Sequence, residues 1–349
     1  MLDDLKYIHQ RDAQDALGIA EKQWQQYQHD FGFAWQPERE IYDVVFAGMG
    51  GSSLAAKVFV SWPGLDVPIT IVNDYRLPSH VNEHTLVICS SYSGNTEEAL
   101  SVLDEAMDDS RASEERPMVV VVASGGKLLE AAQAKQLPFV TLPSGFQPRM
   151  TLGYQLRALV EIFEQTSLLG GGLAELEAAA YWLKDQMSVW SPVVPVAKNS
   201  AKQLALELMG KSPVIYAGPL LAPAAYKWKI SINENAKNVA WCNTLPEFNH
   251  NEFLGWTSHP IDKPYAVVDL RSELEHLRTQ KRFEVTERLL SGRRPAPEVV
   301  QVIGETLLQQ LLWTIAYGDF VSLYLALLNG LNPTPVDLIE KFKAELSKP

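Results

Sequence analysis

At 349 residues the chain is longer than a typical single domain, so its length predicts two domains, each large enough to bury its own core. Its 46% hydrophobic and 21% charged residues are ordinary for a globular protein and argue against extended disorder. The formal charge of −12 argues against nucleic-acid binding, which depends on Lys and Arg neutralising phosphates. An anionic small molecule is still compatible with this charge, because backbone N–H groups and hydroxyls at a helix start can hold a phosphate in an acidic protein.

Cysteine content and hydropathy predict a cytoplasmic protein without a membrane partner. The two cysteines, Cys89 and Cys242, lie in apolar stretches, which is typical of reduced core thiols rather than of a disulfide framework. The N-terminal residues are acidic and lack the apolar run of a signal peptide. The most apolar long segment, residues 307–331, is interrupted by Gly318 and Asp319, so we interpret it as a buried core helix and not as a membrane span.

The first half of the chain alternates between helical and β-rich segments. Residues up to about 39 have helical spacing and predict one or two amphipathic helices, in a segment bounded at 1–40. Apolar β-rich runs follow at residues 42–47, 69–72, 85–90, 118–123 and 139–142, with helical segments between them at 52–61, 96–106 and 127–134. Because almost wholly apolar strands that alternate with helices are typical of a parallel sheet covered on both faces, these elements predict an α/β domain over residues 41–170.

The second half repeats this plan without obvious sequence repetition. A helical stretch over residues 151–188 is interrupted by three glycines at 170–172, which we interpret as a turn or hinge. The elements predicted after it are a helix to about residue 208, a strand at 214–217, a helix at 222–234, strands near 239, at 266–270 and at 299–303, and a C-terminal helix after Pro335. They predict a second α/β domain over residues 190–349.

A glycine turn follows the first predicted strand, in the sequence G-M-G-G-S-S of residues 48–53. Glycines allow the backbone to approach a ligand, and the start of the next helix presents unpaired N–H groups to an anion. Gly50, Gly51 and Ser52 are therefore candidate phosphate ligands. Two alternatives stay open: a purely structural turn, and a dinucleotide site in which Asp74 binds the ribose. Against a dinucleotide, a serine stands where the third glycine of G-x-G-x-x-G belongs.

A hydroxyl-rich loop, S-Y-S-G-N-T at residues 91–96, follows the third predicted strand and again enters a helix. Ser91, Ser93 and Thr96 offer hydroxyl groups that can donate to phosphate oxygens. Such residues also cap helices, which is the structural alternative, but one hydroxyl would suffice for a cap. Several hydroxyls beside a glycine turn favour a phosphate site. We call the two loops, residues 48–53 and 91–96, the phosphate cradle.

Together the two loops resemble the sugar isomerase (SIS) domain, whose hallmark is a Ser/Thr-rich loop that holds a sugar phosphate. Further blocks resemble the bifunctional phosphoglucose/phosphomannose isomerases: the opening M-L-D-D, Q-P-R and L-G-Y within residues 147–154, I-N-E-N-A-K at 232–237, and L-P-E-F-N-H-N-E at 245–252. The resemblance implies two SIS domains, each a doubly wound, flavodoxin-like parallel sheet between helices. It also implies an aldose–ketose isomerase whose substrates are hexose 6-phosphates, those of glucose and mannose.

The resemblance assigns roles to three further residues. Moving a proton between C1 and C2 through a cis-enediol needs a base, and ring opening needs another acid or base. By resemblance Glu234 is the proton-transfer base, and His250 opens the sugar ring from the neighbouring subunit, which would require a homodimer. Arg149 is the candidate that stabilises the enediolate, because a guanidinium stays charged when partly buried. Each residue also has a structural alternative: Glu234 could mark a helix end, His250 could be a hydrogen-bonded structural residue, and Arg149 could lie on the surface at a helix start.

Near the C-terminus the resemblance implies a threonine and a lysine in the site. Thr334 lies in the sequence N-P-T-P, and either Lys341 or Lys343 fits the lysine role, with a solvated helix face as the alternative for both. The sequence H-V-N-E-H at residues 80–84 matches an inverted zinc-protease motif, but that motif needs a helix, and this segment runs into a predicted strand. We therefore expect neither a metal nor an organic cofactor.

Two further hypotheses compete with the isomerase. A catalytically silent SIS protein that senses a sugar phosphate would share the phosphate cradle, and only Glu234 and His250 separate it from an enzyme. A nicotinamide-dependent dehydrogenase is the third hypothesis.

Overall fold

The computed structural model describes residues 1–108, 110, 112–257 and 264–346. The chain forms two compact units: the first-sheet unit, Lys22–Lys184, and the second-sheet unit, which combines Met1–Glu21 with Asp185–Pro349. The predicted N-terminal segment 1–40 is therefore divided between the units. Its first part belongs to the second-sheet unit because the Tyr7 hydroxyl donates to the carbonyl of Leu327 at 2.7 Å. The predicted domain bounds at 41–170 and 190–349 stay a prediction.

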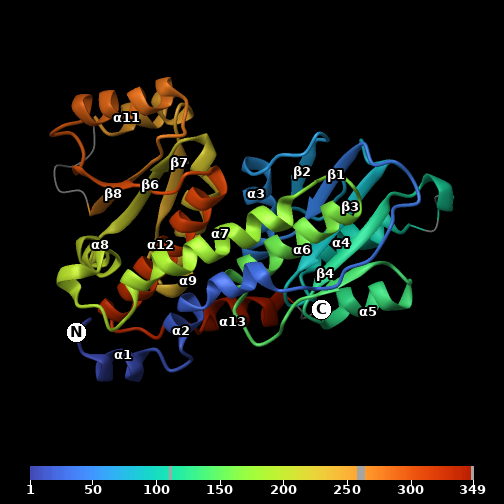
Figure 1. Ribbon diagram of the computed structural model, residues 1–349, viewed down its shortest axis with the longest axis horizontal. Helices are drawn as coiled ribbons and strands as arrows, with labels where there is room; N and C mark the ends of the chain where they lie inside the picture. Colours follow the sequence, from blue (N-terminus) through green and yellow to red (C-terminus); the bar gives the residue numbers. More distant parts are fainter. Residues whose placement is uncertain (109, 111, 258–263, 347–349) are drawn as a thin grey trace. The chain divides into compact units, whose positions relative to one another are not determined.

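The first-sheet unit contains a five-stranded parallel sheet in the order β2-β1-β3-β4-β5 (Figure 1). Its strands are β1 Asp43–Ala47, β2 Ile69–Val72, β3 Thr85–Ser91, β4 Met118–Ala123 and β5 Phe139–Thr141. Every residue of β3 and β4 is buried, as expected for strands that are covered on both faces. This agrees with the predicted runs to within a residue or two.

Helices cover both faces of the first sheet. They are α3 Leu54–Ser61, α4 Glu97–Ala106, α5 Gly126–Ala134 and α6 Leu152–Gln165, and α7 Gly172–Met187 follows α6 along the chain. On one face α4 and α5 share a buried core with strand residues that include Val45, Val87 and Val121. Helices α3 and α6 pack on each other through Phe59 and Phe163, whose ring centroids are 4.7 Å apart.

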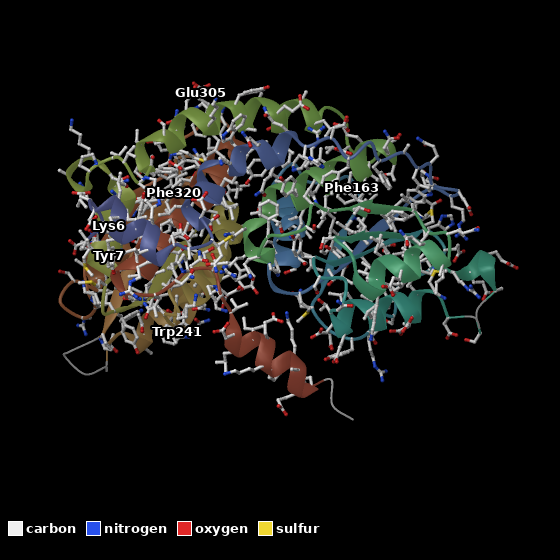
Figure 2. The ribbon with its side chains drawn as sticks, turned by 90° about the horizontal axis from the view of Figure 1, so that it is seen from below. Lys6, Tyr7, Phe163, Trp241, Glu305 and Phe320 are labelled. Carbon is white, nitrogen blue, oxygen red and sulfur yellow. The ribbon has the colours of Figure 1, made fainter. Side chains whose placement is uncertain are left out.

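The second-sheet unit contains a four-stranded parallel sheet in the order β7-β6-β8-β9. Its strands are β6 Ser212–Ala217, β7 Trp241–Thr244, β8 Tyr265–Arg271 and β9 Pro297–Gln301. The strand predicted near residue 239 begins later, at Trp241 (labelled in Figure 2), because the backbone N–H of Ala240 donates to the Asn233 side chain at 2.9 Å and holds a turn there. The order matches that of the first four strands of the other sheet, so both units have one topology.

Helices of this unit are α1 Leu5–Arg11, α2 Ala16–Glu21, α8 Ser200–Leu208, α9 Ala222–Asn235, α10 Glu252–Gly255, α11 Leu277–Leu289, α12 Leu307–Leu328 and α13 Asp337–Leu346. By length and composition α12 could cross a membrane, but 89% of its apolar window is buried within the protein, as in a core helix. Phe320 of α12, labelled in Figure 2, is fully buried. On the other face of the sheet a core that includes Tyr216, Phe248 and Phe283 joins the strands to α11.

Short 3-10 helices connect these elements: η1 Gln23–Gln28, η2 Gly50–Ser53, η3 Ser113–Glu115, η4 Pro148–Met150, η5 Ser188–Trp190, η6 Val196–Lys198, η7 Pro219–Leu221 and η8 Glu247–His250.

Candidate active site

The phosphate cradle lies at the topological switch point of the first sheet. In the order β2-β1-β3-β4-β5 the chain turns to opposite sides after β1 and after β3, and ligands of doubly wound sheets bind outside the carboxyl ends of those two strands. Residues 48–53 directly follow β1, and residues 91–96 follow β3. The order is flavodoxin-like and differs from the 3-2-1-4 order of dinucleotide-binding sheets, which argues against the nicotinamide hypothesis.

The loop after β1 combines one glycine in a left-handed conformation with one in a tight contact. Gly50 has φ +49°, a conformation that glycine adopts without strain. A Cβ on Gly51 would lie 2.9 Å from the carbonyl carbon of Pro148 and 3.0 Å from the backbone nitrogen of Arg149. The absence of a side chain at Gly51 therefore lets the cradle and η4 touch, which brings Arg149 next to the predicted phosphate site.

One hydroxyl group of the cradle joins its two loops, and others bond within the second loop. Ser52 Oγ accepts a hydrogen bond from the backbone N–H of Tyr92 at 3.0 Å. Ser91 Oγ lies 2.7 Å from Thr96 Oγ1 and also accepts from the backbone N–H of Gly94 at 3.1 Å. Thr96 occupies the N-cap position of α4, but its side chain makes no capping hydrogen bond. The capping alternative therefore does not account for this hydroxyl, which bonds to Ser91 across the loop instead.

A third loop, after β4, supports the cradle and was not predicted as part of the site. Ser124 donates to the carbonyl of Tyr92 both from its backbone N–H, at 3.0 Å, and from its hydroxyl, at 2.6 Å. The backbone N–H of Leu128 donates to the carbonyl of Gly94 at 2.9 Å. The sequence signal was available, because S-G-G at residues 124–126 follows a buried strand as the cradle loops do.

Arg149 is a buried cation beside the cradle. Its side chain belongs to η4 and is 1% exposed, so the alternative of a surface arginine is wrong. Its Nη1 donates to Gln147 Oε1 at 3.4 Å. Burial strengthens the field of this guanidinium beside the cradle, because little water screens it. The first-sheet unit thus brings together Arg149 and all six predicted phosphate ligands.

Glu234 lies in the last turn of α9, at the amino edge of the second sheet. Helix α9 begins beyond the carboxyl ends of the parallel strands, where β6 ends, and runs back along the sheet. It ends at Asn235, near the amino ends of the strands, where β7 begins. The alternative that Asn233, Glu234 and Asn235 form a helix end is therefore confirmed for the backbone. Thr334 belongs to the same edge, because Lys237 Nζ donates to the carbonyls of Asn332 and Pro333, both at 2.9 Å.

His250 ends η8, which follows β7 and therefore lies at the carboxyl edge of the second sheet. Its ring is exposed, whereas its neighbours are fixed. Phe248 is fully buried, and the Asn249 amide donates to Thr286 Oγ1 at 2.9 Å and accepts from Arg282 Nη1 at 3.1 Å. Within one chain, His250 and Glu234 are thus at opposite edges of the sheet and do not meet.

The two candidate lysines belong to α13, whose described residues are all solvent-exposed or only partly covered. Lys343 Nζ lies 3.0 Å from Glu340 Oε1, and both side chains are more than half exposed. This is the solvated helix face that was the alternative for Lys341 and Lys343. The role of either lysine in the site stays a prediction.

The zinc-protease spelling at residues 80–84 does not form a helix. His84 Nδ1 lies 2.9 Å from the carbonyl oxygen of Glu40, and His80 Nε2 lies 3.7 Å from the Asp43 carboxylate. The two histidines therefore have separate structural partners, and the helical spacing that the motif needs is not present in this segment.

The switch point of the second sheet is filled by a carboxylate of the chain itself. Glu275 follows β8, and its Oε1 accepts the backbone N–H of Leu220 at 2.9 Å, at the start of α9. Burial raises the pKa of this carboxyl, while hydrogen bonds from the N–H groups of Leu220 and Leu221 act in the opposite direction. A Cβ on Gly218 would lie only 2.3 Å from the carboxylate. The position equivalent to the predicted phosphate site of the first sheet is thus occupied here by Glu275.

Known proteins match this chain in sequence and in fold. A family model described as the bacterial phospho-glucose isomerase C-terminal SIS domain matches residues 197–346. A bifunctional phosphoglucose/phosphomannose isomerase of Caldicellulosiruptor bescii is 37% identical over 317 residues, which cover 88% of this chain and 91% of the relative. A bifunctional phosphoglucose/phosphomannose isomerase of Aquifex aeolicus is 35% identical over 308 residues, which cover 87% of this chain and 90% of the relative. The chain belongs to the bifunctional phosphoglucose/phosphomannose isomerase family.

Membership of this family confirms the resemblance, and the two helix-covered parallel sheets confirm the predicted fold class. The crystal structure of a glucose-6-phosphate isomerase like protein from Thermus thermophilus has the same fold, with a TM-score of 0.61 at 20% identity, covering 97% of this chain and 99% of that one. A D-glucosamine-6-phosphate 4-epimerase of Sulfolobus acidocaldarius is 33% identical over 227 residues, or 64% of this chain and 67% of the relative. A hexosamine 6-phosphate is therefore a necessary control substrate.

Proposed function

We propose that this protein interconverts glucose 6-phosphate and mannose 6-phosphate with fructose 6-phosphate through a cis-enediol intermediate. The observation that carries the proposal is the phosphate cradle at the switch point of the first sheet, in a chain of an isomerase family. The backbone N–H groups around Gly51 and the hydroxyls of the cradle would hold the phosphate, which is the part that all three sugars share.

The chemistry needs a base, a positive charge and a ring-opening group. In the open-chain aldose Glu234 would remove the C2 proton, the C–H electron pair would form a double bond between C1 and C2, and the carbonyl electrons would move onto O1. The same carboxylic acid would then return the proton to C1, while the O2 hydroxyl gives up its proton to become the ketone oxygen and O1 takes up a proton to become a hydroxyl. C1 is reduced and C2 oxidised within one molecule, so no external oxidant is needed. Glucose 6-phosphate and mannose 6-phosphate differ only at C2, and the planar enediol removes that difference. Arg149 would stabilise the enediolate oxygens.

We propose further that the working unit is a homodimer in which His250 of one chain completes the site of the other. The position of the two groups at opposite edges of the second sheet supports this. Helix α9, with 14 residues, spans about 20 Å between these edges. A histidine at the carboxyl edge does not reach a glutamate at the amino edge of its own sheet, so a shared site needs a second copy.

A coupled assay tests the activity. The purified protein, with a chelator present, should turn over both hexose 6-phosphates, and glucosamine 6-phosphate serves as the control for epimerase chemistry. Glu234→Gln should abolish turnover and keep the protection from thermal unfolding that fructose 6-phosphate gives. A fully active Glu234→Gln variant would refute the assignment of Glu234 as the proton-transfer base. If fructose 6-phosphate protects the wild type from thermal unfolding but the wild type turns over neither substrate, the sensor hypothesis is favoured. If NAD alone protects it, the dehydrogenase hypothesis is favoured.

Mixing two inactive variants tests the homodimer. Glu234→Gln and His250→Ala each remove one group from every site of their own dimers. Hybrid dimers would contain one site with both groups intact, so random exchange of subunits should restore about a quarter of the wild-type activity. Mixtures that stay inactive after subunit exchange has been verified would contradict the shared site.

We also propose a cytoplasmic location. Its support is that Cys89 and Cys242 are both free thiols, Cys89 being fully buried in the first core. Fractionation of cells that produce the protein, with an antibody against it, should place it in the cytosolic fraction, and recovery from a membrane or secreted fraction would overturn the proposal.

A further inference from the structure

Lys237 joins two segments of the second-sheet unit that lie far apart in the sequence. It stands just beyond α9, three residues after Glu234. Its Nζ donates to the carbonyl of Asn235 at 3.2 Å and to the carbonyls of Asn332 and Pro333, each at 2.9 Å. An ammonium has three N–H donors, and here three carbonyl oxygens accept from it. One of the bonded segments carries Glu234, and the other leads directly into Thr334.

The backbone at Lys237 adopts a conformation that its side chain disfavours. Its φ is +50°, in the left-handed region that L residues rarely occupy. Such a conformation persists only where the surrounding contacts fix it, and these positions cluster at functional sites. Lys237 directly follows the C-cap of α9, where helices often end in this conformation, and the three hydrogen bonds of its ammonium hold the turn there.

Other polar contacts fix the residues on either side of Glu234. Asn233 Oδ1 accepts the backbone N–H of Ala240 at 2.9 Å, and Asn235 Nδ2 donates to Ser322 Oγ of α12 at 2.9 Å. The last turn of α9 is thereby attached to the sheet and to α12. Lys237 adds a connection to the loop of Thr334 through the carbonyls of Asn332 and Pro333.

We propose that Lys237 is a positioning residue for isomerisation: its ammonium clamps the turn that carries Glu234 to the loop that carries Thr334. The inference rests on the proposed function, because it assumes that Glu234 transfers the proton. The clamp keeps the carboxylate at a fixed distance from the segment of Thr334. A displacement of about 1 Å at a proton-transfer group can lower turnover by roughly 10²-fold.

Lys237→Gly is the informative variant, because glycine adopts a left-handed φ without strain while the ammonium is lost. We expect kcat to fall by about 10- to 100-fold. KM for fructose 6-phosphate should change less than about threefold, since the phosphate cradle is in the other unit. The primary isotope effect with glucose 6-phosphate deuterated at C2 should increase, because proton transfer becomes slower relative to the other steps.

Lys202 of α8 offers a matched control. It is fully buried, and its Nζ donates to three carbonyl oxygens, those of Leu2 at 2.6 Å and of Pro192 and Val194 at 2.8 Å. As in the Lys237 clamp, one ammonium donates to three carbonyl oxygens, and here it also pairs with Asp3 Oδ1 at 3.3 Å. None of these segments carries a predicted site residue. Lys202→Met should lower the midpoint of urea unfolding and leave kcat and the isotope effect of the folded enzyme unchanged.

The outcomes separate the two proposals. A wild type that isomerises, together with a Lys237→Gly variant of unchanged kcat and isotope effect, would overturn the role of Lys237 and leave the function standing. Equal losses of kcat in Lys237→Gly and Lys202→Met would also overturn it, since the effect would then follow stability alone. A wild type without isomerase activity would reject the proposed function itself, and the inference with it.

Discussion

Replacing Gly94 with alanine adds a methyl group where the phosphate cradle meets the loop after β4. A Cβ at this position would lie 1.7 Å from the carbonyl oxygen of Gly125 and 2.7 Å from its carbon, whereas ordinary contacts begin at 3.4 Å. The neighbouring backbone cannot adjust freely, because Leu128 donates to the Gly94 carbonyl and Ser124 to that of Tyr92. The two loops must therefore separate by more than about 1 Å.

Two costs add up at Gly94. Its φ is +69°, and a left-handed conformation costs an L residue about 1–2 kcal/mol. Forcing the loops apart costs about 1–3 kcal/mol more, by analogy with overpacked cores. The free energy of unfolding should thus fall by about 2–5 kcal/mol. Because the hydroxyls of the cradle move with the loop, KM for fructose 6-phosphate should rise, and turnover should fall by up to roughly 10²-fold.

Gly32→Ala separates the two costs. Gly32 lies in the same unit with φ +60°, and nothing lies within 4 Å of a Cβ built there, so this variant should lose only about 1–2 kcal/mol. Urea unfolding measures the stability of both variants, and the coupled assay measures kcat and KM. If Gly94→Ala is as stable as Gly32→Ala and its KM is that of the wild type, the close approach to Gly125 has no consequence and the reasoning fails.

Two further substitutions test charges of the structure. Arg149→Lys keeps a positive charge but loses the planar guanidinium, which can donate two parallel hydrogen bonds. The value of kcat should fall by about 10²-fold, as it does when an enzyme loses one hydrogen-bond donor to the transition state. An unchanged kcat would exclude stabilisation of the enediolate by Arg149. Burial raises the pKa of the Glu275 carboxyl in the folded protein above its value of 4.5 in the unfolded chain. The carboxyl therefore contributes fully to the free energy of unfolding below pH 4.5, and this contribution is lost as pH rises through the folded pKa. Glu275→Gln removes this loss; its free energy of unfolding relative to the wild type should increase with pH above 4.5, and a constant difference across the same urea titrations would contradict the assignment.

The sheet strands could be predicted because each is a short apolar run that needs no distant partner to be recognised. Residues 85–90 and 118–123 predicted β3 and β4 almost to the residue, since both strands are wholly buried. Helix α11, Leu277–Leu289, was not predicted, because only Thr279, Phe283 and Thr286 are buried and the apolar periodicity is correspondingly weak.

The candidate site divides in the same way. The cradle could be predicted because its glycines and hydroxyls follow strand ends directly, where parallel topology must gather them. The burial of Arg149 could not, since it depends on Gly51 letting η4 approach. The separation of Glu234 from His250 within one chain was implied only by the resemblance, because it depends on which sheet edge each residue reaches and not on the 16 positions between them.

The two sheets share one topology but differ at their switch points. Both sheets turn at an equivalent switch point, between β1 and β3 and between β6 and β8. In the first, hydroxyls bond to one another around N–H groups, an arrangement that can exchange these contacts for phosphate oxygens. In the second, Glu275 already supplies a carboxylate to the start of α9, and a second anion would meet its charge. This difference favours the first sheet as the phosphate site of the proposed function, and Glu234 and His250 lie at the two edges of the second sheet.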